Sequence, residues 1–240
     1  MEILPIAHFR SPLTTKFGLP RQSGIATNLK GRIVMARAYS APDYIRGLKD
    51  FSHLWIIWGF SAHVCAEKHA TVRPPRMGGN VRMGVFATRS PFRPNNLGLS
   101  SVCITDITTL QAHDDEGDYT ATAIEVEGAD LMDGTPVYDI KPYLPFCDSH
   151  PEASGGFTTS HSWQELKTVI PDSIDCLSQA DKTAISQILS QDPRPHYHDD
   201  PQRVYGMPYG TWDVKFRVEQ GQAIVTEINK STTFEEKQNK

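Results

Sequence analysis

The first 146 residues are divided into short runs that are β-branched or that alternate apolar with polar residues, and turn residues bound each run. The runs lie at 33–38, 54–60, 81–87, 101–107 and 119–126. No long amphipathic helix alternates with them, which disfavours a doubly wound parallel sheet. Because many short strands must protect their edges from other chains, this pattern predicts a closed or nearly closed β-barrel.

The pattern changes after residue 147. Residues 148–162 are small and polar, which is typical of a linker. Residues 179–190 space their apolar side chains as a helix does, with Asp181 in the first turn. Two alternating runs, 211–219 and 222–228, are joined by Gln220-Gly221 and predict a β-hairpin. We therefore expect a mainly β chain, with a barrel domain over 1–147, a linker over 148–162, a small α+β domain over 163–230 and a polar tail over 231–240.

Composition restricts the compartment and the partners. The longest apolar run, 54–60, is far shorter than the ~20 residues of a membrane span, so we expect no membrane association. The first residues lack the basic and apolar regions of a signal peptide. The four cysteines form no Cys-x-x-Cys pair, and the histidines show no reliable metal spacing, so we expect reduced thiols, no metal and a cytoplasmic location. A formal net charge of −4 excludes a uniformly basic nucleic-acid binder, although a local basic site remains possible.

Charge is distributed unevenly along the chain. Between Lys68 and Thr105 there is no Asp or Glu, and five arginines fall in this band: Arg73, Arg76, Arg82, Arg89 and Arg93. A guanidinium group binds phosphate or carboxylate through two parallel hydrogen bonds and stacks on bases. The band therefore favours a site for an anionic ligand over a simple solvated face.

Residues 84–101 form the densest motif inside the arginine band. Six polar residues fall within nine positions: Thr88, Arg89, Ser90, Arg93, Asn95 and Asn96. Pro91 and Pro94 stiffen this loop, which makes it suited to holding a ligand. It has neither the Gly-Lys-Ser/Thr of a Walker loop nor Gly-x-Gly-x-x-Gly, which disfavours the common phosphate-loop enzymes. Further along, Asp133-Gly134 is a turn signal, and Asp133, Asp139 and Lys141 add charged groups that a ligand could contact.

In these motifs the chain resembles the TrmO/TsaA-like family of S-adenosylmethionine-dependent tRNA methyltransferases. The resembling segments run in order along nearly the whole chain: 20–22, 51–55, 71–76, 84–100, 133–146 and 192–197. The resemblance implies a β-barrel methyltransferase domain, S-adenosylmethionine as cofactor, tRNA as substrate, and a homodimer. It further implies methylation of N6 of the threonylcarbamoyl-modified adenosine beside the anticodon.

The resemblance also implies site residues. Cofactor contacts are expected at Pro20, Arg21, Gln22, Arg89, Leu99 and in the turn of Asp133, Gly134, Thr135 and Pro136. At a further cofactor position relatives carry a His-polar pair, whereas this chain has Ser61 and Ala62 followed by His63. Either Ser61 and Ala62 contact the cofactor through their backbone, or His63 does so from a shifted position.

The acceptor nitrogen is acylated, so removal of its proton should assist the reaction. Candidate general bases for this proton are Asp133, Asp192, His196 and Tyr197. The ring of Tyr197 could instead stack on a nucleobase of the tRNA. Arg93 and Arg194 are candidate partners for the threonyl carboxylate of the substrate. We therefore name Asp192, Arg194, Tyr197 and Arg93 as candidate catalytic residues. Two other classes of function stay open: a non-catalytic RNA-binding module that uses the arginine band, and an anion-handling hydrolase that uses Asp133 and Asp139.

Overall fold

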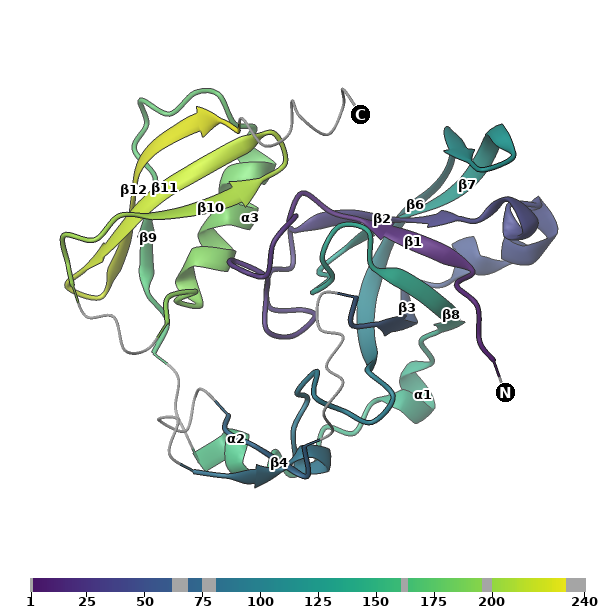
Figure 1. Cartoon of the computed structure of the whole chain (residues 1–240), viewed down its shortest axis with the longest axis horizontal. Helices are drawn as coiled ribbons and strands as arrows, with labels where there is room; N and C mark the ends of the chain where they lie inside the picture. Colours follow the sequence, from purple (N-terminus) through teal and green to yellow (C-terminus); the bar gives the residue numbers. More distant parts are fainter. Residues whose placement is uncertain (1, 62–68, 75–80, 161–163, 196–199, 232–240) are drawn as a thin grey trace.

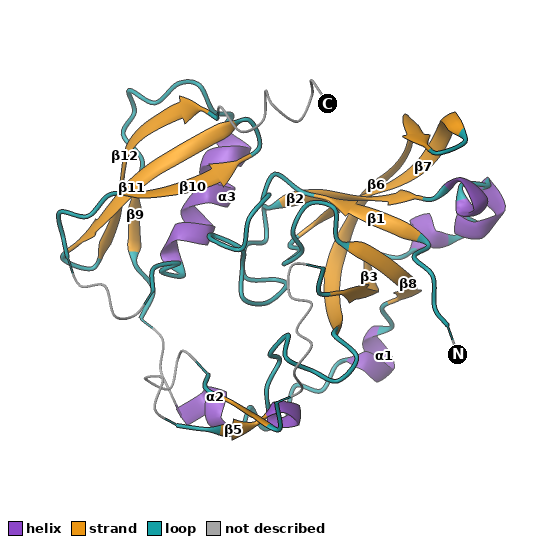
Figure 2. Cartoon of the chain, in the orientation of Figure 1, coloured by secondary structure: helices purple, strands orange, loops and turns teal. Residues whose placement is uncertain are grey.

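The computed structural model describes residues 2–61, 69–74, 81–160, 164–195 and 200–231. Strands dominate it (Figure 2). The expectation of a mainly β chain is confirmed.

Six strands form the first unit (Figure 1). They are β1 (Ala7–Arg10), β2 (Lys30–Met35), β3 (His53–Gly59), β6 (Leu97–Asp114), β7 (Gly117–Glu127) and β8 (Pro136–Pro142). The strands are hydrogen-bonded in the order β1-β2-β7-β6-β3-β8, and Ala7 of β1 pairs with Val137 of β8, which closes the ring into a barrel. Every neighbouring pair is antiparallel.

The alternation of side chains along each strand fills the barrel. In β3, Leu54, Ile56 and Trp58 are buried, while the residues between them are more exposed. The same alternation in other strands adds Phe9 and Ile33 to the interior. Since successive side chains of a strand point to opposite faces, this alternating pattern alone selects the inner face.

Four strands and one helix form the second unit. They are β9 (Lys167–Val169), α3 (Gln179–Ser190), β10 (Tyr205–Tyr209), β11 (Trp212–Glu219) and β12 (Gln222–Lys230), with sheet order β10-β11-β12-β9. The predicted helix over 179–190 is confirmed to the residue, and the side chain of Ser178 caps it by accepting from the Asp181 backbone N–H at 3.1 Å. The predicted hairpin is also confirmed, because Gln220 and Gly221 both have the positive φ that a tight turn between β11 and β12 requires. This unit is mostly sheet.

Between β1 and β2, the chain leaves the barrel and packs into the second unit. Leu13, Ala26 and Leu29 are buried in the same cluster as α3 and the second sheet. The Gly210 backbone N–H donates to the Pro12 carbonyl at 2.7 Å, and the Asn28 N–H donates to Gln187 Oε1 at 3.0 Å. The loop over 11–29 is therefore a shared part of both units, although it precedes the second by more than a hundred residues.

The remaining elements are short. The 3-10 helices are η1 (Arg37–Tyr39), η2 (Pro42–Ile45), η3 (Leu48–Asp50) and η5 (Val85–Ala87); the others are β4 (Thr71–Val72), β5 (Met83–Gly84), α1 (Pro145–Asp148) and α2 (Phe157–Ser160). The predicted strand over 81–87 is wrong: β4 offers only two residues for pairing with β5, and the chain then turns into η5. An alternating pattern forms a strand only where a neighbouring strand supplies the hydrogen bonds.

Within the described residues no helix is long and apolar enough to cross a membrane. Cys103, Cys147 and Cys176 are free thiols, and Cys65 lies outside the described residues.

Candidate functional site

The polar loop that follows η5 is braced by its own side chains. Thr88 Oγ1 donates to the Val85 carbonyl at 2.9 Å, and the Ser90 N–H donates back to Thr88 Oγ1 at 3.3 Å. Arg93 donates to the Thr88 carbonyl at 2.6 Å. These contacts fix the backbone of the loop without long-range packing. Arg93, a predicted catalytic residue, therefore holds the loop in shape with at least part of its guanidinium group.

Two segments that were both predicted to bind cofactor meet at Arg89. Its guanidinium donates to the side-chain oxygen of Gln22, a residue 67 positions away in the sequence. Beside this contact, Pro20 is buried and Arg21 is half-buried. The structure thus brings the Pro20-Arg21-Gln22 segment and the arginine band together.

A second group of predicted residues surrounds a small hollow of about 190 Å³. Ser61 and Pro136, both predicted cofactor residues, line it. The other lining residues are Gly59, Phe60, Asn95, Asn96 and Tyr138. Amide groups and aromatic rings in one hollow offer both hydrogen bonds and stacking surfaces to a planar ligand. Ala62 and His63 lie outside the described residues, so the choice between them stays open.

The predicted turn at Asp133 is present and is anchored on β1. Gly134 has a φ of 78°, and its N–H donates to the Phe9 carbonyl at 2.8 Å. The Asp133 carboxylate accepts from the Ser11 N–H at 3.1 Å and lies 3.6 Å from the Arg10 guanidinium. Thr135 is buried. The Asp133 carboxylate thus contacts groups at the end of β1.

Three polar residues that the sequence analysis did not single out lie next to these segments. Trp58 Nε1 donates to Ser100 Oγ at 2.9 Å, and Ser100 Oγ donates to Asp130 Oδ1 at 2.5 Å. Burial raises the pKa of Asp130, while hydrogen bonds and the charge of Arg89 act in the opposite direction. No local pattern marks these residues, because they come from β3, β6 and the turn after β7. Leu99, the predicted cofactor residue beside Ser100, is 58% exposed.

The predicted catalytic pair in the second unit forms a close ion pair. Arg194 Nε and Nη2 donate to the two Asp192 carboxylate oxygens, each at 2.8 Å. Both side chains are only 16% exposed, and Asp192 has a φ of 46°. A two-point contact of this kind sets the orientation of the guanidinium group. His196 and Tyr197 lie outside the described residues.

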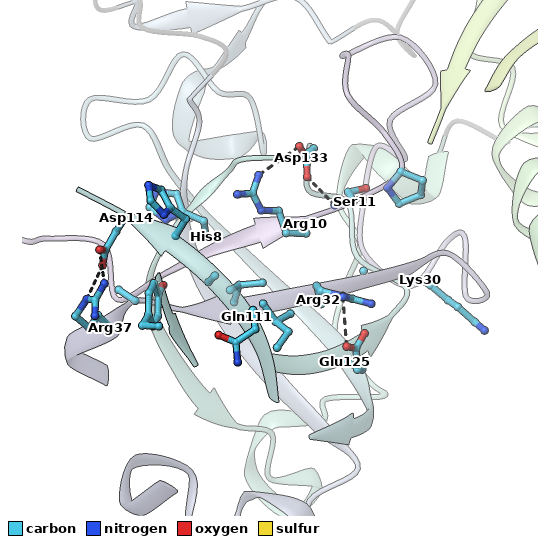
Figure 3. A pocket seen from close by; sticks show the side chains of 18 residues that line it. His8, Arg10, Ser11, Lys30, Arg32, Arg37, Gln111, Asp114, Glu125 and Asp133 are labelled. Atoms are coloured by element: carbon cyan, nitrogen blue, oxygen red, sulfur yellow. Dashed lines mark hydrogen bonds and ion pairs between the residues drawn. The ribbon is translucent and has the colours of Figure 1, made fainter. Parts of the chain in front are cut away.

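The outer face of the barrel carries a larger groove of about 930 Å³ between β1, β2, β6 and β7 (Figure 3). Four cations line it: Arg10, Lys30, Arg32 and Arg37. Arg10 pairs with Asp133, Arg32 with Glu125 at 3.3 Å, and Arg37 with Asp114 at 2.6 Å. Hydrogen bonding to Arg37 lowers the pKa of Asp114. Since three of these cations have carboxylate partners in the groove, its charge is mixed.

No cluster of three or more His, Cys, Asp or Glu residues suited to a metal ion occurs in the described part of the chain.

Comparison with known proteins gives matches over both units. Residues 8–149 match the tRNA-methyltransferase O N-terminal domain, and residues 165–231 match the TrmO C-terminal domain. The tRNA (adenine(37)-N6)-methyltransferase of Escherichia coli (strain K12) is 39% identical over 220 residues, which is 89% of each chain. The protein of the same name from Eikenella corrodens is 46% identical over 181 residues, which is 75% of this chain and 97% of the relative.

Solved structures match the whole fold. A chain described as TrmO superposes with a TM-score of 0.73 at 28% identity, and covers 95% of this chain and 98% of its own. TrmO from Pseudomonas aeruginosa gives the same TM-score and coverage at 26% identity.

Proposed function

Because this chain belongs to the tRNA-methyltransferase O family, we propose that it transfers a methyl group from S-adenosylmethionine to N6 of adenosine 37 in tRNA. The acceptor we propose is the threonylcarbamoyl-modified adenosine, in tRNA of the cytoplasm. One observation supports the proposal beyond the family match. Arg89 and Gln22, which come from two distant segments predicted to bind the cofactor, are in direct contact. A site assembled from such separate segments is expected for a ligand-binding barrel.

The residues present fit the proposed cofactor. The guanidinium of Arg89 can bind a carboxylate, such as the one at the amino-acid end of S-adenosylmethionine. At the small hollow of about 190 Å³, Phe60 and Tyr138 provide aromatic rings, and Asn95 and Asn96 provide amide groups. Together they match a ligand that has a charged amino-acid end and a planar base.

The cofactor supplies a methyl group on a positively charged sulfur; in an in-line transfer the acceptor nitrogen bonds to the methyl carbon and the sulfur leaves as a neutral thioether. The protein contributes alignment and the exclusion of water. The loop over 84–100 is suited to alignment because Thr88, Ser90 and Arg93 brace it internally. A braced loop holds Arg89 in one orientation and so lowers the entropy cost of ordering the ligand.

Four side chains remain candidates for the base that removes the N6 proton: Asp133, Asp192, His196 and Tyr197. Two of them, Asp133 and Asp192, lie beside arginines, at 3.6 Å and 2.8 Å respectively. Both oxygens of the Asp192 carboxylate already accept from Arg194. Arg93 and Arg194 remain our candidates for binding the threonyl carboxylate, although each already has contacts within the protein.

We propose that the site is completed in a homodimer. The hollow beside Ser61 is smaller than the roughly 300–1,000 Å³ usual for ligand sites of this size class. Leu99, a predicted cofactor residue, is 58% exposed on its strand. A second copy that covered Leu99 would add its own surface to the site, and light scattering of the purified protein measures whether the chain forms a dimer.

The test of the proposed activity uses labelled S-adenosylmethionine and tRNA with or without the threonylcarbamoyl modification. We expect label to appear only in the modified tRNA. RNA binding without any transfer would favour a non-catalytic RNA-binding module. Turnover of an anionic substrate without S-adenosylmethionine would favour a hydrolase.

A further inference from the structure

Trp58, Ser100 and Asp130 form a continuous chain of hydrogen bonds at the barrel wall. The indole N–H can only donate, so Ser100 Oγ accepts from it at 2.9 Å. The single hydroxyl hydrogen of Ser100 is then directed to Asp130 Oδ1 at 2.5 Å. Ser100 is 1% exposed and Trp58 is buried. When Asp130 is ionised, the direction of every bond in the chain is determined, and the chain ends on the Asp130 carboxylate.

On its other side, Asp130 faces the segment predicted to bind cofactor. The backbone N–H of Ser23 and the charge of Arg89 both favour the ionised form of Asp130. Ser23 directly follows Pro20-Arg21-Gln22, and Arg89 contacts Gln22. Ser23 Oγ also accepts from the Ser101 N–H on β6 at 3.3 Å. Asp130 thus lies between the barrel wall and the segment 20–23.

The charge on Asp130 carries a cost for the fold. Removing a carboxylate from water is unfavourable unless hydrogen bonds or a close cation compensate. Here the net effect of the surroundings is to raise the pKa, with desolvation as the largest cause. A carboxylate has two acceptor oxygens and can accept from both Ser100 and the Ser23 backbone, whereas an amide of the same shape has only one acceptor oxygen. The charged residue at position 130 therefore links β6 to the segment 20–23 in a way that an amide does not.

We propose that Asp130 is a positioning residue, which holds the segment 20–23 and Arg89 against β6 in the arrangement that binds the cofactor. The inference rests on the proposed function, because it assumes that this segment contacts S-adenosylmethionine. Asp130 itself acts through the Ser23 backbone and through Arg89. Its loss should therefore affect cofactor affinity and leave tRNA affinity unchanged.

Because the pKa of Asp130 is raised, the proposal predicts that cofactor affinity depends on pH. The pKa of Asp130 is higher in the folded protein than in the unfolded chain. The fold therefore loses stability as the pH rises from the unfolded pKa through the folded pKa and Asp130 ionises. Among the described residues, the charge acting on Asp130 is that of Arg89. As the pH falls, protonation of Asp130 removes its attraction for Arg89 and weakens the acceptor for the Ser23 N–H. Cofactor affinity should fall along with it.

The test measures S-adenosylmethionine binding by calorimetry between pH 5 and pH 8 for the wild type and for Asp130→Asn. For Asp130→Asn we expect a Kd about tenfold higher at pH 7, the effect of one charge-assisted contact. We also expect the pH dependence of Kd to be reduced, the KM for tRNA to be unchanged, and the melting temperature at pH 7 to be equal or higher. Thr122→Val is the control, because Thr122 is buried and its hydroxyl donates to the Ser40 carbonyl instead. It should leave Kd and its pH dependence unaltered.

A folded Asp130→Asn protein that binds the cofactor like the wild type overturns the proposal. If Asp130→Asn does not fold, Ser100→Ala decides: losing the hydroxyl donor should raise the Asp130 pKa and shift the pH dependence of Kd upward. An unshifted profile in Ser100→Ala then overturns the proposal. A wild type that does not bind S-adenosylmethionine at any pH contradicts the proposed function itself, which separates the two failures.

Discussion

At the scale of single residues, Arg89 has the clearest role. Its side chain joins the arginine band to Gln22, which lies 67 positions away. It also supplies the charge that acts on Asp130. One guanidinium group thus connects the loop over 84–100, the segment 20–23 and the turn after β7. A change at this position should affect all three at once.

Arg89→Ala should weaken S-adenosylmethionine binding by about 1–3 kcal/mol, the scale of a lost charged hydrogen bond. Calorimetry of the folded variant measures this change. Arg46→Ala is a matched control, because Arg46 is exposed and pairs only locally with Asp43. Equal affinity in Arg89→Ala and the wild type would remove Arg89 from the site.

At the scale of elements, the loop over 11–29 links cofactor binding to the second unit. Gly18 in this loop has a φ of 86°, and a Cβ atom there would lie 2.3 Å from Met207 Sδ. Met207 belongs to β10 and is buried. The loop therefore approaches β10 as closely as a glycine permits, a few residues before Pro20-Arg21-Gln22.

Gly18→Ala should lower the free energy of unfolding by about 2–3 kcal/mol, since it combines backbone strain with overpacking. Gly24→Ala provides the control: Gly24 has a φ of 78° but nothing within 4 Å of its Cβ position. It should lose only the strain component, about 1 kcal/mol. Urea unfolding of both variants gives the two values, and equal losses would show that the approach to Met207 is unimportant.

At the scale of the whole molecule, the two units share a hydrophobic core. Phe17, from the loop after β1, stacks on Tyr205 and Phe216 with ring centroids 6.3 Å and 6.2 Å away. The second unit therefore packs on the loop that carries Pro20, Arg21 and Gln22. Its packing and the geometry of the cofactor segment are expected to change together.

Phe17→Ala should cost about 2–3 kcal/mol of stability, below the value for a fully buried phenylalanine because Phe17 is only partly buried. It should also weaken S-adenosylmethionine binding, although Phe17 itself is not expected to contact the cofactor. Thermal unfolding and calorimetry on the same sample measure the two effects. Lost stability with unchanged cofactor affinity would contradict the coupling between the units.

The net charge of −4 belongs to this scale as well. It averages an acid-free arginine band with acidic segments elsewhere in the chain. The net negative charge outside the arginine band weakens sequence-independent binding to RNA, so recognition of tRNA must rely on local contacts.

The sequence by itself determined the features that depend on neighbours along the chain. The helix over 179–190 follows from apolar residues that recur every three to four positions and from the cap by Ser178, which accepts from the N–H of Asp181. Both signals join residues that are at most four positions apart. The β11–β12 hairpin follows from two alternating runs and the Gln220-Gly221 turn. The family, and with it the candidate cofactor segments, followed from motifs that are each contiguous.

Only the tertiary structure decided which distant groups meet. The β-type pattern over 81–87 forms a strand only at Met83–Gly84, because its pairing partner is two residues long. The loop over 11–29 was assigned to the barrel by position, yet its apolar residues complete the core of the second unit. Asp130 acquired a candidate role only through Ser100, Ser23 and Arg89, which no local pattern associates with it. Hydrogen bonds and burial between remote segments depend on how the sheets close and pack, and periodicity along the chain does not encode that directly.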